Sequence, residues 1–284
     1  MSAPSDLGDD PRKTRQRGSL HGRRKGPKLS VHQAALFESL LPRLKLDLQA
    51  GVDPRNYFNA PVDDVWLEIG FGAGEHLLWQ AQRHPNIGLL GAEPYQAGVA
   101  KLLSKLHSLS LSGGEGLLRL NGSCQVESPP HPSPLPQGGR RDCIANLRIY
   151  EGDARDIVET LPDASLGRVF LLFPDPWPKT RHHKRRFIQM EMLDKFARVM
   201  KPGAEFRFAS DDPGYVEWTL ERMLLHSAFQ WMAVRSRDWR ERSEDWPPTR
   251  YEQKALHGVP AFLRFRRLMV NRSMLLHSDV PKRT

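Results

Sequence analysis

A carboxylate held between prolines is the most distinctive chemical feature of this 284-residue sequence. Residues 174–179 read Pro-Asp-Pro-Trp-Pro-Lys and directly follow an apolar run at residues 169–173. Each proline fixes its own φ and restricts the residue before it, so Asp175 lies on a rigid stretch of backbone. An acid mounted in this way at the end of a buried strand could orient a ligand for reaction. A merely structural turn would not need Asp, Trp and Lys together.

A glycine-rich turn follows another apolar run, at residues 65–69, and contains Gly70, Gly72 and Gly74. Such a turn lets a ligand approach the backbone, although a close strand-to-helix turn alone would look the same. The dinucleotide fingerprint would require glycine at position 75, where this chain has Glu75. An anion there opposes a pyrophosphate at the helix N-terminus, which argues against a dehydrogenase. A ligand with no phosphate and a positive centre, such as S-adenosyl-L-methionine (SAM), fits better.

Two further acids follow predicted strands. Glu93 comes 19 residues after Gly74, where an acid can accept hydrogen bonds from both ribose hydroxyls of a nucleoside cofactor. The alternative for Glu93 is an exposed turn acid before Pro94. Asp153, followed by Ala154, comes after the strand expected at residues 147–150. Asp153 could contact an adenine edge or cap the next helix, and spacing does not separate the two.

The positive charge of the chain is concentrated in two places. The formal net charge is +9, yet residues 1–30 hold eight basic and three acidic residues, and residues 179–186 hold five basic residues and no acid. Clustered positive charge on an otherwise nearly neutral chain indicates a polyanionic partner. A solvated tail with a solubilising loop is the alternative.

The pattern of apolar runs predicts the elements that position these residues. Strands expected at 65–69, 87–92, 147–150, 169–173 and 205–208 alternate with helices expected at 75–83, 95–107, 156–161, 185–200 and 215–226. Late strands at 231–234 and 262–268 complete the set. This alternation predicts an α/β fold with a doubly wound, mostly parallel, Rossmann-like seven-stranded sheet whose last strands are antiparallel. Such sheets bind ligands at the carboxyl ends of their strands.

We expect three parts along the chain: a basic disordered tail at 1–30, and a single domain at 31–284 that carries a disordered insertion at 108–142. Gly, Ser and Pro supply 17 of the 35 residues of that insertion. No targeting or membrane-spanning segment is visible, and two cysteines can supply neither a disulfide framework nor a usual zinc site. We therefore expect a cytoplasmic protein without metal or membrane attachment.

The sequence resembles the bacterial tRNA (guanine-N7)-methyltransferase family. The residues that carry this resemblance are 68–72, 91–94, 173–186, 209–211 and 249–252. The family implies a class I methyltransferase fold, SAM as methyl donor, and a guanosine in the variable loop of tRNA as acceptor. We expect a monomer or a weak homodimer.

The resemblance also implies roles for individual residues. Asp175 would be the catalytic-site acid, close to both cofactor and guanine. The expected cofactor-binding residues are Glu68, Gly70, Gly72, Gly74, Glu93, Asp153, Ala154 and Asp175. The expected substrate-binding residues are Lys179, Asp211, Thr249, Arg250, Tyr251 and Glu252, with Asp212 as an alternative to its neighbour Asp211. The expected RNA contacts are Arg181, His182, His183, Lys184, Arg185 and Arg186.

Two alternatives remain beside this interpretation. The first is a SAM-dependent methyltransferase that acts on another RNA, on DNA or on protein, against which the proline-rich motif and Thr-x-x-Glu argue. The second is a catalytically silent RNA-binding subunit, which would be expected to have lost Glu68, Asp175 or Glu252. All three acids are present.

Overall fold

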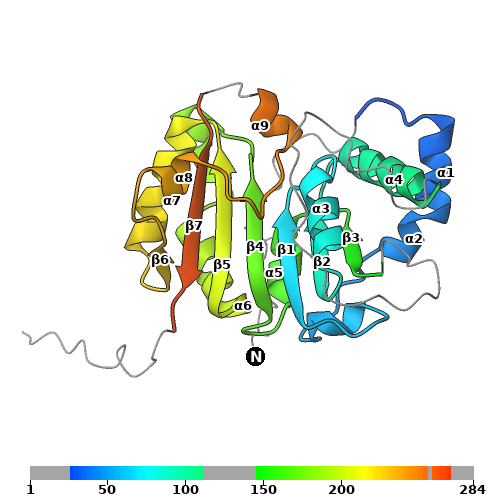
Figure 1. The fold of residues 1–284 in the computed structure, drawn as a ribbon, viewed down its shortest axis with the longest axis horizontal. Coiled ribbons are helices and arrows are strands. Elements are labelled where there is room, and N and C mark those ends of the chain that lie inside the picture. Colours follow the sequence, from blue (N-terminus) through cyan, green and yellow to red (C-terminus); the bar gives the residue numbers. More distant parts are fainter. Residues whose placement is uncertain (1–25, 112–144, 255–257, 270–284) are drawn as a thin grey trace, which may run out of the picture.

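The computed structural model describes residues 26–111, 145–254 and 258–269, and these contain a seven-stranded sheet in the order β3-β2-β1-β4-β5-β7-β6 (Figure 1). Neighbouring strands from β3 to β5 are parallel, β7 is antiparallel to β5, and β6 is antiparallel to β7. The predicted fold class is therefore confirmed. The strands are β1 (Asp64–Ile69), β2 (Ile87–Ala92), β3 (Leu147–Tyr150), β4 (Leu166–Leu172), β5 (Met200–Ser210), β6 (Phe229–Trp231) and β7 (Ala261–Arg267).

Helices cover both faces of this sheet, and short helical turns connect it. The α-helices are α1 (Val31–Ser39), α2 (Leu41–Leu44), α3 (Glu75–Arg83), α4 (Gln96–Leu111), α5 (Ala154–Thr160), α6 (Met190–Val199), α7 (Pro213–Leu225), α8 (Arg237–Arg240) and α9 (Arg250–Lys254). The 3-10 turns are η1 (Pro54–Tyr57) and η3 (Thr180–Arg185). Within the described residues, no helix is both long and apolar enough to cross a membrane.

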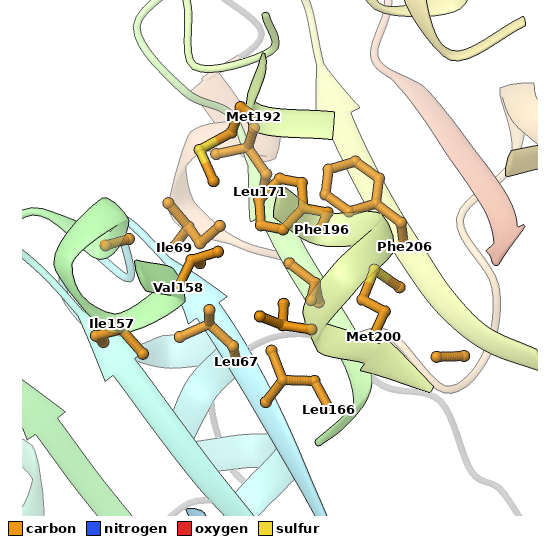
Figure 2. Close-up of a cluster of buried hydrophobic side chains, with 14 of the residues drawn as sticks. Leu67, Ile69, Ile157, Val158, Leu166, Leu171, Met192, Phe196, Met200 and Phe206 are labelled. Atoms are coloured by element: carbon orange, nitrogen blue, oxygen red, sulfur yellow. The ribbon is translucent and has the colours of Figure 1, made fainter. Parts of the chain in front are cut away.

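Alternation along the strands sends side chains to two separate cores. On β1, Leu67 and Ile69 pack with α5, α6 and α7, and Figure 2 shows part of this cluster, including Phe196 of α6. The next residues in alternation, Trp66 and Glu68, point to the opposite face, where α1 to α4 cover the sheet. The side chains of β1 therefore contribute to both cores.

The segment between α8 and α9 crosses this second face of the sheet (Figure 1). Its Trp246 is fully buried with Phe170 and Phe262, and its Asp245 carboxylate lies 2.5 Å from Nη2 of the buried Arg207 on β5. The chain that leads to residues 249–252 is therefore fastened to the sheet core.

Three predicted elements differ from the observed ones. The helix expected at 185–200 begins only at Met190, because the chain first forms η3, closed by backbone bonds such as Arg186 N–H to His183 O at 3.0 Å. The helix does end before residues 201–203 as predicted, yet β5 begins at once at Met200. The late strand expected at 231–234 is β6, Phe229–Trp231.

Most of the expected tail and insertion lies outside the described residues. The chain can be described from Gly26, and Ser30 caps α1 in a reciprocal capping box with Gln33. At the other end of the gap, α4 continues to Leu111, so the first residues of the expected insertion are helical.

Gly74 is expected to be sensitive to substitution, because two requirements coincide there. It has φ +73°, and a Cβ atom built on it would lie 2.5 Å from Cδ1 of the buried Leu102. Gly51 has a similar φ of +74°, but among the described residues no heavy atom lies within 4 Å of its Cβ position. Gly51→Ala should thus cost about 1–2 kcal/mol of unfolding free energy from backbone strain alone. Gly74→Ala should cost about 1–3 kcal/mol more from overpacking, as measured by urea denaturation. Equal costs at the two positions would contradict the packing role of Gly74.

Candidate functional site

A cavity of about 740 Å³ opens at the carboxyl ends of the central strands. It lies beside β1 and β4, the point where the strand order reverses, as expected for an open α/β sheet. The residues predicted from the sequence that line it are Gly70, Gly72, Glu93, Asp153, Ala154, Asp175, Arg185 and Arg250. The segments that follow β1, β2, β3 and β4, together with the start of α9, thus bring these residues together.

The glycine turn forms an open wall of the cavity. Gly70 and Gly72 have φ values of +70° and +56°, which favour glycine. Among the described residues, no heavy atom lies within 4 Å of a Cβ placed on Gly70, so this position faces open space. On the outer side, Gly98 of α4 packs so closely that its Cβ would lie 2.6 Å from the Gly72 carbonyl oxygen. Gly74, in contrast, contacts α4 and does not line the cavity.

Glu93 is fixed in the cavity by two backbone donors. The Gly72 N–H donates to Oε2 at 2.7 Å and the Tyr95 N–H donates to Oε1 at 2.9 Å. Burial raises the pKa of the Glu93 carboxyl above its ordinary value, and the nearby Asp175 and Glu68 charges act in the same direction. Each oxygen keeps a second acceptor site for a ligand hydroxyl. Glu93 is therefore held by the glycine turn and is not an exposed turn acid.

Asp153 both caps a helix and lines the cavity. It is the N-cap of α5, with its carboxylate 3.0 Å from the Arg155 N–H, and it forms an ion pair with the Arg155 guanidinium at 2.8 Å. Ala154 and Arg155 line the cavity next to it. The helix cap and the adenine contact, the two alternatives that the spacing left open for Asp153, therefore do not exclude each other.

Asp175 lines the cavity and is exposed to solvent, on the rigid motif that the sequence indicated. Phe173 and Trp177 on either side have φ values of +49° and +45°. Such values are uncommon for residues other than glycine and are found where the surroundings enforce them. The carboxylate is solvent-accessible, yet partial withdrawal of water by the cavity walls raises its pKa. Among the described residues, none donates a hydrogen bond to it.

Arg186 is the anchor of this motif and does not face solvent. Its side chain is 2% exposed, Nε donates to the Pro176 carbonyl at 2.9 Å, and Nη1 donates to the Gly214 carbonyl at 2.9 Å. The guanidinium also stacks on the rings of Tyr215 and Trp218 of α7. These contacts replace the expected RNA contact, because a buried guanidinium cannot reach a phosphate backbone.

The other residues of the basic run point in different directions. Lys179, Arg181 and Lys184 are exposed, whereas Arg185 lines the cavity with its guanidinium 4.9 Å from the Trp177 ring. The rings of His182 and His183 pack against Trp177 and Trp218, respectively. The run therefore presents its lysines and Arg181 outward and uses its remaining members within the fold.

Glu68 lies behind the cavity wall. It is 3% exposed, and the His76 Nδ1 lies 2.7 Å from its Oε2. Glu68 and Thr249 line the same small cleft, which shares Gly70 and Phe173 with the large cavity. The predicted cofactor acid of β1 is therefore adjacent to the cavity and does not line it.

The remaining predicted substrate residues lie around α7 and α9. Asp212 caps α7 by accepting from the Tyr215 N–H at 2.7 Å, and Asp211 is buried outside the large cavity. Thr249 and Glu252 form a capping box, and the Arg242 Nε donates to the Glu252 carboxylate at 3.0 Å. Tyr251 belongs to α9, and its side chain lies outside the described residues.

Several cavity residues were not predicted from the sequence. Tyr95, Lys101, Arg155 and Phe187 all line it. Tyr95 and Arg155 each lie two residues after a predicted site acid, so their position in the loop was a usable local signal. Lys101 and Phe187 come from helix α4 and from the chain before α6, and only the tertiary fold places them here.

Comparison with known proteins shows the family to which the chain is similar. Residues 63–261 match the family described as "Putative methyltransferase". The tRNA (guanine-N(7)-)-methyltransferase of Brucella abortus (strain 2308) is 45% identical over 251 residues, covering 88% of this chain and 94% of the relative. That of Rhodospirillum rubrum is 43% identical over 265 residues, covering 90% and 91%. Among solved structures, the 16S rRNA methyltransferase KamB matches with a TM-score of 0.49 at 17% identity, covering 80% of this chain and 98% of that one. On the two sequence relatives and the family match, this chain belongs to the tRNA (guanine-N(7)-)-methyltransferase family.

Proposed function

We propose that this chain transfers a methyl group from SAM to N7 of a guanosine in the variable loop of tRNA, as a cytoplasmic enzyme with one methyltransferase domain. The observation that carries the proposal is the accessible carboxylate of Asp175, which lies on a rigid mount and lines the same cavity as Gly70, Gly72 and Glu93. The residues of the glycine turn and Glu93 suit a nucleoside cofactor, and the exposed Asp175 suits a base.

The polar groups that line the cavity fit SAM. Glu93 is oriented to accept from ribose hydroxyls, and the open space at Gly70 lets a ligand pass against the backbone. The carboxylates of Glu93 and Asp175 both line this cavity, and their negative charge suits a positive sulfonium centre. Bound SAM supplies an electrophilic methyl group. We assign the adenine side to Asp153, which caps the neighbouring helix and lines the cavity.

The acceptor chemistry needs orientation more than base catalysis. Guanine N7 carries an in-plane lone pair and no proton, so no group has to remove one. Its N1–H and exocyclic amine are adjacent donors, and an ionised carboxylate is a pure acceptor. We assign this guanine edge to Asp175, because Glu252 is engaged by Arg242 and Asp211 does not line the cavity. Holding the ring in this way leaves N7 facing the methyl donor.

The tRNA backbone would be held outside the cavity. Lys179, Arg181 and Lys184 are exposed next to the proline-rich motif, and Arg250 is exposed at the cavity wall. Contacts of this kind release counterions, so tRNA affinity should fall steeply as salt rises. A splayed base in a loop is the form in which proteins usually read RNA bases.

The proposal is tested with purified full-length protein, unmodified tRNA and SAM carrying a labelled methyl group. After digestion to nucleosides, the label should be found in 7-methylguanosine. Label in another nucleoside would favour a different RNA methyltransferase. Absence of label with retained tRNA binding would favour the silent RNA-binding subunit.

The pH dependence of the reaction should reflect the raised pKa values of Asp175 and Glu93. Both acids are needed as ionised acceptors, so kcat/KM should fall on the acid side, at a pH above their ordinary values of 3.8 and 4.5. A carboxyl whose folded pKa is raised favours folding when protonated, so these two groups do not unfold the protein in that range. The measurement is kcat/KM against pH, with circular dichroism at each point. Full activity down to pH 4.5 would contradict the proposed roles.

A further inference from the structure

A buried hydrogen-bond chain runs through α3 from the glycine-turn strand to the segment between α8 and α9. The His76 Nδ1 lies 2.7 Å from Oε2 of Glu68, and the His76 Nε2 lies 3.0 Å from Nε2 of Gln80. The same Gln80 nitrogen donates to the backbone carbonyl of Asp245 at 3.1 Å. Glu68, His76 and Gln80 are 3%, 2% and 0% exposed, so water does not compete for these bonds.

The partners define the direction of every bond in this chain. The Asp245 carbonyl can only accept, so the group facing it is the Gln80 amide nitrogen, which has two protons to give. The second proton goes to the His76 Nε2, which must then be unprotonated. His76 is therefore the neutral Nδ1–H tautomer, and its one proton is donated to the Glu68 carboxylate. Gln80 donates at both of its contacts, and His76 in turn donates to the Glu68 carboxylate.

Each end of this hydrogen-bond chain lies next to a different part of the proposed site. Glu68 shares its small cleft with Gly70, whose other side faces the cofactor cavity, and with Thr249. Asp245 lies on the segment that continues to Thr249 and Arg250, and its carboxylate is held by Arg207 at 2.5 Å. Helix α3 thus joins the wall proposed for the cofactor to the segment proposed for the substrate.

We propose that His76 and Gln80 are positioning residues, which hold Glu68 and the glycine turn at a fixed position relative to residues 245–252. This inference rests on the proposed function, and it adds two residues that do not touch either substrate. A buried carboxylate without a donor is costly, so loss of the His76 proton donor should displace Glu68 and the wall beside it. Loss of Gln80 should release the Asp245 carbonyl and the His76 Nε2, while the bond between His76 and Glu68 stays in place.

Three variants separate these effects. His76→Phe removes both bonds of the imidazole, whereas Gln80→Leu removes the bonds to the Asp245 carbonyl and to the His76 Nε2 but leaves the bond between His76 and Glu68. His76→Asn keeps an amide N–H near the Nδ1 position, so it should restore the donor to Glu68 without reaching Gln80. The matched control is His84→Phe, because His84 is a partly buried imidazole at the end of the same helix α3 that takes no part in the hydrogen-bond chain.

The readouts are the SAM Kd from calorimetry without tRNA, the KM for tRNA, and the melting temperature. His76→Phe should weaken SAM binding and raise the KM for tRNA, each about 10- to 100-fold, as expected for misplacement of a site. Gln80→Leu and His76→Asn should raise the KM for tRNA while the SAM Kd stays within about twofold of wild type. His84→Phe should change neither constant.

Two outcomes would overturn the inference. One is an unchanged SAM Kd in a folded His76→Phe protein. The other is a parallel change of both constants in all variants, which would indicate a general loss of stability. If His76→Phe does not fold, the split between the two constants in His76→Asn and Gln80→Leu decides the question. A wild-type protein that binds SAM but forms no 7-methylguanosine would instead overturn the proposed function, and the SAM Kd values would still test the inference.

Discussion

Asp175→Ala should lower kcat by about 100- to 1,000-fold, the usual cost of removing one charged group that aligns a reacting centre. The affinity for tRNA should stay within about twofold of wild type, because the exposed Lys179, Arg181 and Lys184 remain in place. The reason is that the carboxylate orients the guanine ring and does not hold the RNA backbone. Single-turnover rates and a filter-binding Kd, measured on the same preparation, separate the two effects.

Asp175→Asn and an unrelated acid serve as controls for that result. Asn keeps the size of the side chain but brings an N–H₂ donor towards the donors of the guanine edge, so its kcat should fall nearly as far as with Ala. Asp163→Ala removes an exposed acid that pairs with Arg198 ahead of β4, outside the cavity, and should leave kcat unchanged. A normal turnover rate in Asp175→Ala would contradict the role given to this carboxylate.

Arg186→Met should lower the free energy of unfolding by about 2–4 kcal/mol, because the Pro176 and Gly214 carbonyls lose a charged donor that Met cannot replace. Since Arg186 holds the motif that carries Asp175, kcat should also fall, by about 10-fold or more. The salt dependence of tRNA binding should stay as in wild type. Urea denaturation, kcat and the slope of log Kd against log salt give the three values.

Lys184→Met is the matched control, since Lys184 is an exposed cation two residues earlier. It should leave stability unchanged and make the salt slope shallower by about one, as for the loss of one phosphate contact. If Arg186→Met behaved in the same way, with normal stability and a shallower slope, the buried anchor would be contradicted and the RNA contact expected from the sequence would be restored.

The sheet and the centre of the cavity could be predicted because their signals are local. Apolar runs that end in Gly70, Glu93 or Asp175 mark both a strand and the loop after it, and a parallel sheet brings such loops together. Residues 249–252 carry another local signal. Thr-x-x-Glu is the pattern of a capping box, and the structure forms one at the start of α9.

The roles of Arg186 and His76 could not be predicted because their partners are remote in sequence. In the sequence, Arg186 belongs to a uniformly basic run, and its burial depends on α7, whose Gly214 is 28 residues away. His76 is 8 residues from Glu68, but its Gln80 neighbour bonds to Asp245, 165 residues along the chain. Composition and spacing report a charge or an imidazole, whereas long-range packing decides whether that group meets solvent or another element.

The most direct test of the central claim replaces the acceptor atom itself. A tRNA with 7-deazaguanosine at the methylated position has carbon in place of N7 and keeps the N1–H and amine donors of the guanine edge. We predict that it binds with unchanged affinity and accepts no methyl group, while the matched guanosine tRNA is methylated and can then be cleaved chemically at 7-methylguanosine in the variable loop. Methylation of the 7-deaza tRNA at the normal rate would contradict the account.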